Sequence, residues 1–312
     1  RTVKEQWECS VNHVNFLPVM KFLIAVGSRT YSEPTLRVGM QIAKAFQASA
    51  TIVYVGEKIS KYMVGHVQLA HERLEEWDFK RPGVEVLEWA FHFLAENGYI
   101  TPLTIETGFR QHKLVDQGTR AELYLQGTVC SEVNLILRNG DIISELRDEV
   151  TQEHYDVTII GGSQKRRMGH DLIQFIGSSI FVVNNFQPDE KYRLLIAVDD
   201  SPGTNKAVKY GARIAHELGM EVTLLTVSKK DFFGKGYRGA ANRAAKFMRR
   251  AGVTHENLFK VGDPAKVIKA TAGKNSIIIM GASRKHPLAK FFTGSKPLKV
   301  MENCYCPVLI VK

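Results

Sequence analysis

The chain has 312 residues, of which 44% are hydrophobic and 24% charged, a globular composition with room for two domains of ordinary size. No stretch approaches the roughly 18 consecutive apolar residues of a membrane-spanning helix, so we expect no insertion into a membrane. The four cysteines fit neither a disulfide framework nor a zinc motif, because the Cys304–Cys306 spacing is wrong for a zinc pair. We therefore expect a reducing, cytoplasmic setting and no metal site.

Charge is unevenly divided along the chain. Residues 191–312 hold 23 Lys and Arg against 8 Asp and Glu, a net charge of +15, whereas residues 1–190 hold 19 against 24, a net charge of −5. A strongly basic half favours an anionic ligand or partner, and halves of opposite charge can face each other. Solvated lysines that keep the protein soluble are the alternative interpretation.

The first half predicts a strand, an amphipathic helix and a second strand, followed by three further strands. They are expected at 22–26, 36–46 (the helix), 51–55, 133–137, 156–163 and 180–183. An insert at about 98–132 contains alternating segments at 104–107 and 122–126, which predict an extra hairpin.

The second half repeats this order. Its helix ends at Gly219, a C-cap candidate, and Asp263 with Pro264 predicts the start of another helix. Near-continuous apolar strands that alternate with helices predict a parallel sheet covered on both faces. The second-half strands are expected at 194–198, 222–227, 258–261, 276–283 and 308–311.

The recurrence predicts an internal duplication. We expect a lead segment at 1–20, a first domain at 21–185, a linker at 186–191 and a second domain at 192–312. Each domain is expected to be α/β, with a doubly wound, Rossmann-like parallel sheet.

A glycine-containing run follows the predicted strand that ends near Gly281. It re-enters a helix near Ser295, and an open α/β sheet binds ligands at such a crevice, where a helix N-terminus offers N–H groups to phosphate. Gly281 and Gly294 allow close backbone approach, and Arg284 and Lys296 add positive charge. A plain strand-to-helix turn is the alternative interpretation.

The second half resembles the universal stress protein family, whose nucleotide-binding members carry Gly-x2-Gly-x9-Gly-(Ser/Thr) after the fourth strand. Gly281 matches the first glycine, and Gly294-Ser295 matches the last pair at the family's nine-residue spacing. Arg284 stands in the place of the second glycine, and Lys296 follows the serine. The resemblance implies that these residues bind the phosphates of a nucleotide.

The same resemblance implies a site for adenosine. Asp199 matches the Asp that follows the first strand and contacts the adenosine, and Val227 matches the residue that closes the second strand and packs on adenine. Met280 precedes the first glycine of the motif. The implied ligand is ATP or another adenine nucleotide, with Mg, or a smaller phosphate-type anion.

The whole chain looks like a tandem universal stress protein that forms an intramolecular pseudo-dimer. The resemblance implies that 180–183 pairs with 308–311 across the two-fold axis, which would cover two sheet edges. In the first copy Gly27 stands in the place of the Asp, and the loop at 162–169 is too short for the motif, so we expect no nucleotide there.

No catalytic motif is present: the sequence has no Walker A loop, no His-Glu-x-x-His and no Gly-x-Ser-x-Gly. His286 is interpreted as an exposed loop residue, and no general base or metal carboxylate pair is evident. We therefore expect a non-enzymatic, stress-associated regulatory protein with an unidentified protein partner. The resemblance allows at most slow ATP hydrolysis, and it allows a homo-oligomer of the pseudo-dimer.

A basic segment at 229–250 supports other interpretations. It is either a cover helix with a solvated face or a surface for nucleic acid, anionic lipid or the acidic first half. Nucleic acid is disfavoured because no aromatic RNA-binding motif accompanies it. The competing functions are a basic binding module without a nucleotide and the cytosolic regulatory domain of a larger transporter.

Overall fold

The structure is a computed structural model that describes residues 19–27, 29–58, 83–112, 114–117, 120–130, 132–162, 176–282, 300 and 304–312. The first half contributes β1 (Lys21–Val26), α2 (Arg29–Phe46), β2 (Ser49–Gly56), α5 (Val84–Glu96), β5 (Glu132–Asn139), α7 (Ile142–Glu153), β6 (Val157–Gly161) and β7 (Ser179–Val183). Between α5 and β5 the insert forms α6 (Pro102–Thr107), the short helix η2 (Phe109–Gln111), β3 (Leu114–Gln117) and β4 (Arg120–Gln126). The second half contributes β8 (Arg193–Ala197), α9 (Pro202–Leu218), β9 (Val222–Ser228), α10 (Lys235–Arg250), β10 (His255–Val261), α11 (Pro264–Ala272), β11 (Ser276–Gly281) and β12 (Val308–Val311). No helix in these ranges is long and apolar enough to cross a membrane.

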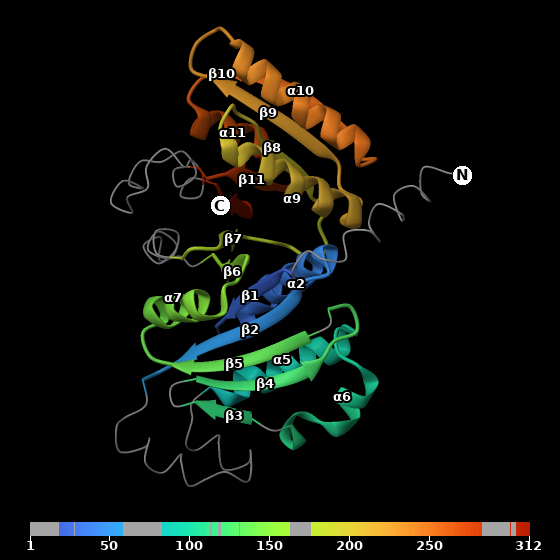
Figure 1. Ribbon diagram of the computed structural model, residues 1–312, viewed down its shortest axis with the longest axis vertical. Helices are drawn as coiled ribbons and strands as arrows, with labels where there is room; N and C mark the ends of the chain where they lie inside the picture. Colours follow the sequence, from blue (N-terminus) through green and yellow to red (C-terminus); the bar gives the residue numbers. More distant parts are fainter. Residues whose placement is uncertain are drawn as a thin grey trace, which may run out of the picture.

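The strands form one twelve-stranded sheet with the order β10-β9-β8-β11-β12-β7-β6-β1-β2-β5-β4-β3 (Figure 1). Five strands of each half follow the same order, and their registers agree. Phe22 lies opposite Ala50, as Leu194 lies opposite Val222. The predicted class, α/β with doubly wound parallel sheets, is confirmed.

The repeat extends to side-chain packing. A Cβ on Gly39 of α2 would lie 2.9 Å from Ile24 Cδ1, and a Cβ on Gly211 of α9 would lie 2.3 Å from Ile196 Cδ1. In both halves, therefore, a glycine lets the first helix cross closely over the first strand. The sequence predicts an apolar face on each helix, and its residues are buried except that Leu218 is only partly buried; they are Leu36, Met40, Ala43 and Phe46 in α2, and Ala207, Tyr210, Gly211, Ile214, Ala215 and Leu218 in α9.

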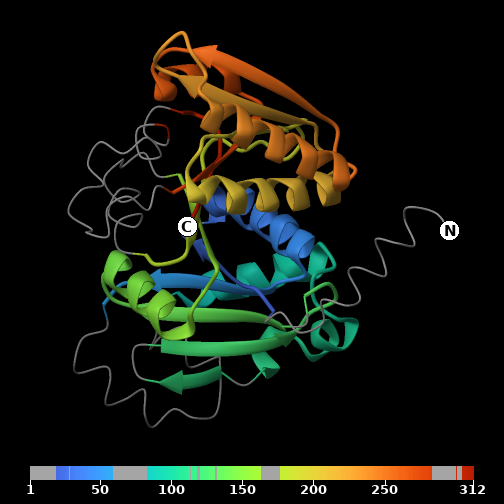
Figure 2. The same cartoon turned by 45° about the horizontal axis from the view of Figure 1, so that its top comes forward.

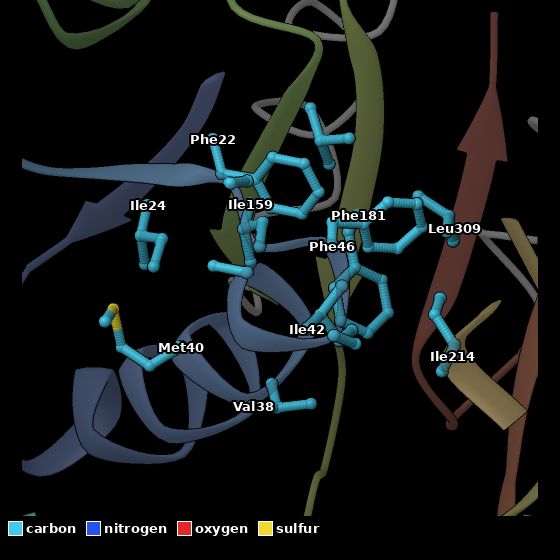
Figure 3. Close-up of a cluster of buried hydrophobic side chains, with 14 of the residues drawn as sticks. Phe22, Ile24, Val38, Met40, Ile42, Phe46, Ile159, Phe181, Ile214 and Leu309 are labelled. Atoms are coloured by element: carbon cyan, nitrogen blue, oxygen red, sulfur yellow. The ribbon is translucent and has the colours of Figure 1, made fainter. Parts of the chain in front are cut away.

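The two halves share one core and one sheet. β7 and β12 pair antiparallel, with Ile180 opposite Ile310 and Phe181 opposite Leu309, which confirms the expected pairing of 180–183 with 308–311. Figure 3 shows Phe181 and Leu309 in the same buried cluster as side chains of α2 and α9. Each of these strongly apolar strands would lie at the edge of its own half of the sheet, and the pairing buries both of them away from water.

Helices α2 and α9 also lie against each other, between the two halves (Figure 2). Arg213 of α9 donates from Nε to the Ala45 carbonyl at 2.8 Å and from Nη2 to the Phe46 carbonyl at 3.1 Å. Carbonyls in the last turn of a helix lack intrahelical partners and attract cations. A side chain of the second half therefore caps a helix of the first.

The insert differs in part from the prediction. Residues 104–107 belong to α6 rather than to a strand, so the hairpin is formed by β3 and β4, and only the segment at 122–126 is confirmed. Thr101 precedes this helix and accepts a hydrogen bond from Thr104 N at 3.4 Å, and Pro102 is its first residue. These two start features outweigh the short polar–apolar alternation that suggested a strand.

Candidate functional site

A pocket lies at the carboxyl ends of β8, β9 and β11. These strands are neighbours in the sheet, so residues far apart in the sequence meet there. Four predicted residues, Asp199, Val227, Met280 and Gly281, come together in its lining. The full lining is Ala197, Val198, Asp199, Leu225, Val227, Pro264, Ile268, Met280 and Gly281.

Asp199 is held by the turn that starts α9. Its Oδ1 accepts hydrogen bonds from Ser201 N at 3.0 Å, from Ser201 Oγ at 2.5 Å and from Thr204 Oγ1 at 2.7 Å. Such a turn, in which an Asp side chain binds backbone two residues on, fixes the direction of the carboxylate. Asp199 therefore orients the start of α9 and presents a positioned negative charge beside the pocket.

The same turn is present in the first half without its carboxylate. Gly27 N donates to Ser32 Oγ at 2.6 Å, just as Asp199 N donates to Thr204 Oγ1 at 3.3 Å. Gly27 thus occupies the position equivalent to Asp199, as the sequence predicted. The backbone arrangement persists there because a hydroxyl, rather than the acid, receives the hydrogen bond from the turn.

The opposite wall of the pocket is apolar. Val227 is partly buried, and Met280 is buried with 5% of its surface exposed. The pocket measures about 40 Å³. By the same measure one water molecule needs roughly 10–15 Å³, so the pocket has room for a few waters, and an adenine ring enters only if the pocket widens. Met280 is the wall residue best able to move, because its side chain is unbranched and flexible.

Gly281 has a packing role that its motif does not reveal. A Cβ at this position would lie 2.4 Å from the carbonyl carbon of Gly203 and 2.8 Å from Thr204 N. The reciprocal Cβ on Gly203 would lie 2.6 Å from the carbonyl oxygen of Ala282. The first turn of α9 therefore touches the end of β11 backbone to backbone, and only glycine fits on either side.

The remaining predicted site residues lie outside the described residues. Arg284, Gly294, Ser295 and Lys296 fall within 283–299, as does His286. The first-half loop from residue 163 onward lies outside them as well. Within the described ranges, no group of three or more His, Cys, Asp or Glu side chains could hold a metal ion.

Sequence reasoning missed three contributors to the site. Ser201 and Thr204 hold the carboxylate, and their positions two and five residues after an Asp would have predicted it. Ile268 lines the pocket from α11, and no local motif marks such a residue.

Comparison with known proteins relates the second half of the chain to a family. Residues 192–312 match the model of the universal stress protein family. These residues form a universal stress protein domain. A universal stress protein of Methanocaldococcus jannaschii is 29% identical over 140 residues, which cover 38% of this chain and 81% of that protein.

Solved structures of universal stress proteins are similar in fold. One from Archaeoglobus fulgidus has a TM-score of 0.54 and 16% identity, and the match covers 94% of this chain and 96% of that chain. Another from the same organism, solved in complex with dAMP, covers 39% of this chain and 98% of its own at 18% identity and a TM-score of 0.32. The first of these two matches spans both halves of the chain, so the universal stress protein fold extends over both.

Proposed function

We propose that the chain is a tandem universal stress protein, a non-enzymatic regulator whose second domain binds an adenine nucleotide or a smaller phosphate-type anion. The observation that carries this proposal is the pocket at the carboxyl ends of β8, β9 and β11. Asp199, Val227 and Met280 line it, at the positions that contact adenosine in nucleotide-binding members of the family.

The tandem arrangement is supported by the equivalence of the two halves. Strand order and register repeat, and Gly39 and Gly211 take the same place against the first strand of each half. The first domain has Gly27 where the second has Asp199, so it lacks a carboxylate to bind adenosine. We assign it the role of a structural or partner-binding copy.

In the second domain, adenine would pack between Val227 and Met280 while the Asp199 carboxylate accepts a hydrogen bond from a sugar hydroxyl. The phosphates would extend past Gly281 toward Arg284, Gly294, Ser295 and Lys296. The net charge of +15 in residues 191–312 raises the local concentration of such an anion. The bound nucleotide would then alter the affinity for a partner only if the bound and free states contact that partner differently.

The first test is chemical. The purified protein is denatured, and any released nucleotide is identified by chromatography and mass spectrometry. Titration calorimetry with ATP, ADP and AMP then measures binding to protein freed of ligand. No copurified nucleotide together with no heat at millimolar ATP would remove the proposal.

Two matched variants locate the site. Val227→Phe fills the adenine position, whereas Val55→Phe makes the same change at the equivalent end of β2 in the first domain. We expect the first to weaken ATP binding by about tenfold or more, the loss of roughly 1.4 kcal/mol, and the second to leave it unchanged. Equal effects of the two variants would place the site elsewhere.

Asp199→Asn separates charge from structure. The Asn side chain keeps an oxygen that accepts from Ser201 and Thr204, so the turn survives while the negative charge is lost. A weakened nucleotide affinity with an unchanged melting temperature is expected. A variant that binds ATP as the wild type does would show that this carboxylate makes no charged contact with the nucleotide.

The exposed cations of α10 favour a second candidate, a basic surface for nucleic acid or anionic membranes. The helix holds six Lys and Arg and no acidic residue. Binding of a polyanion falls steeply with ionic strength, whereas burial of adenine persists. Titrations with duplex DNA and with ATP at low and high salt therefore distinguish the two.

A further inference from the structure

Strand β10 ends the sheet on the side of the second domain. Among the residues that the structure describes, it pairs with β9 and has no strand on its outer side (Figure 1). The Thr254 carbonyl accepts from Val222 N, and Gly262 N donates to the Ser228 carbonyl, so the even-numbered residues point their backbone groups toward β9. Because these groups alternate along a strand, those of His255, Asn257, Phe259 and Val261 point outward.

The equivalent edge of the first domain is covered. There β4 pairs antiparallel with β5 along its whole length, from Arg120 opposite Arg138 to Gln126 opposite Glu132. Most of β5 is buried as a result, whereas no residue of β10 is buried. The insert therefore shows that this edge of the fold accepts an antiparallel strand, whereas only residues 251–254 separate α10 from β10 at the equivalent point of the second domain.

The open edge carries exposed apolar side chains near the end of the strand. Phe259 and Val261 are 44% and 45% exposed, and the Phe233 and Phe259 rings lie edge to face with their centres 5.1 Å apart. Exposed apolar side chains beside unpaired backbone groups are typical of a surface that adds a strand.

Basic side chains flank this edge. At 100° per residue, Arg238, Asn242 and Arg249 share one flank of α10. The opposite flank, at Gly236, faces the β8–α9 turn, because a Cβ there would lie 3.0 Å from Asp200 Oδ2. Arg238 also donates to the carbonyl of Phe233, whose ring packs on Phe259. The flank that carries the two arginines is therefore the one beside β10.

We propose that β10 is a docking edge for an extended acidic peptide segment of a partner protein, which adds to the sheet as an antiparallel strand. Backbone hydrogen bonds to the four outward-facing residues supply affinity. Phe259 and Val261 favour apolar side chains on the α10 face of the added strand. Arg238 and Arg249 on the same face favour acidic side chains beside them.

A second copy of the chain fits this edge less well. Antiparallel pairing of β10 with β10 of another copy places both α10 helices on the same face of the joined sheet. Each α10 holds six cations and no acidic residue, so the two helices would repel each other. The charge of the edge therefore favours an acidic partner.

The test uses the full chain and a defined probe. A fluorescein-labelled peptide of about ten residues spans the length of β10; valine and glutamate take turns along the face that meets α10, threonine fills the other face, and the same peptide with lysine in place of each glutamate is the charge control. Anisotropy measures the affinity, and hydrogen exchange followed by mass spectrometry measures protection of residues 255–261. We expect the acidic peptide to bind, to protect this strand and to bind several-fold more weakly when salt is raised from about 50 to about 300 mM.

Asn257→Pro removes an outward N–H and leaves the ladder to β9 intact, whereas Asn257→Ala keeps that N–H. We expect the proline variant to bind the peptide about tenfold more weakly and the alanine variant to bind as the wild type does. Arg238→Glu with Arg249→Glu should weaken binding of the acidic peptide and favour the basic one, and this pair carries the test if the proline variant does not fold.

Three results would overturn the proposal. The first is the absence of peptide binding, and the second is binding that leaves residues 255–261 unprotected. The third is a concentration-dependent dimer in sedimentation that strengthens with salt and disappears in Asn257→Pro, which would assign the edge to a second copy. None of these results depends on nucleotide, so they stand apart from the proposed function.

Discussion

Glu149 on α7 is a fully buried carboxylate, and its replacement by Gln should destabilise the first domain. It accepts from Arg120 Nε at 3.0 Å, from Arg138 Nε at 2.7 Å and from the Tyr155 hydroxyl at 3.1 Å. The arginines come from β4 and β5, so the group fastens the insert to the domain. Gln keeps the shape of the side chain but removes the charge that balances two buried guanidinium groups.

The loss of stability depends on how much negative charge remains beside the two arginines. Removing one partner of a buried ion pair costs about 3–5 kcal/mol. Two acids stay in place, Glu122 at 2.5 Å from Arg120 and Glu145 at 2.7 Å from Arg138, so we expect the lower end of this range. At about 2–4 °C for each kcal/mol, a loss of about 3 kcal/mol lowers the melting temperature by about 6–12 °C.

Tryptophan fluorescence reports the first domain selectively. All three tryptophans, Trp7, Trp77 and Trp89, lie in the first half of the chain. Trp89 of α5 packs against the core, with the Phe93 ring 6.3 Å away. Thermal unfolding followed at this signal therefore measures the change without interference from the second domain.

The control variant is Glu153→Gln, at the end of the same helix. Glu153 pairs with Lys21 at 3.7 Å, and the two side chains are about half exposed, at 43% and 49%. Exposed pairs contribute about 0–1 kcal/mol, so this variant should melt almost as the wild type does. Equal shifts for Glu149→Gln and Glu153→Gln would refute the reasoning that burial makes the difference.

Three further predictions concern buried groups. Burial alone would raise the pKa of Glu149, but its arginine partners hold that pKa below the usual value. The ionised carboxylate therefore contributes its full stability above about pH 4.3, the pKa of Glu in the unfolded chain. This contribution is lost as the pH falls through the lower pKa of the folded state. The fluorescence melting temperature should therefore drop below about pH 4.5, less steeply in Glu149→Gln; parallel curves would contradict this. Gly281→Ala should cost about 1–3 kcal/mol by circular dichroism, because the Cβ meets the backbone of Gly203, whereas Gly234→Ala, with its nearest neighbour 3.7 Å away, should be almost neutral. Burial raises the pKa of the Cys130 thiol to about 11, so iodoacetamide at pH 8 should label it only after denaturation, as peptide mass mapping would show.

Much of the fold could be predicted from local sequence because the strands are apolar on both faces. Runs such as 276–281 and 308–311 have few alternatives to a buried parallel strand. The pairing of β7 with β12 across the two halves could not be predicted from the residue pattern alone, and this expectation came from the family resemblance. The prediction for the insert was partly wrong, because the four alternating residues at 104–107 are a weaker signal for a strand than Thr101 and Pro102 are for the start of a helix.

The candidate site divides in the same way. Asp199, Val227 and Met280 were assigned through the family resemblance, which could be applied because the strands that they follow or end were clear in the sequence. The contact between Gly203 and Gly281 could not be predicted, because it joins the start of a helix to the end of a strand almost eighty residues away and leaves no local pattern. The motif glycine was therefore assigned to a ligand when part of its constraint comes from the protein's own backbone.

Because β7 and β12 belong to one chain and pair antiparallel, the first half of the chain always pairs with the second half. Two separate chains with these sequences would sort into like and unlike pairs, whereas one continuous polypeptide always matches the Gly27 copy with the Asp199 copy. The segment that joins the halves thus determines which copies pair, and the β7–β12 ladder and the Arg213 cap are contacts between the halves that lie outside that segment. Each chain then carries a single carboxylate-bearing turn, so under the proposed function it would bind one nucleotide.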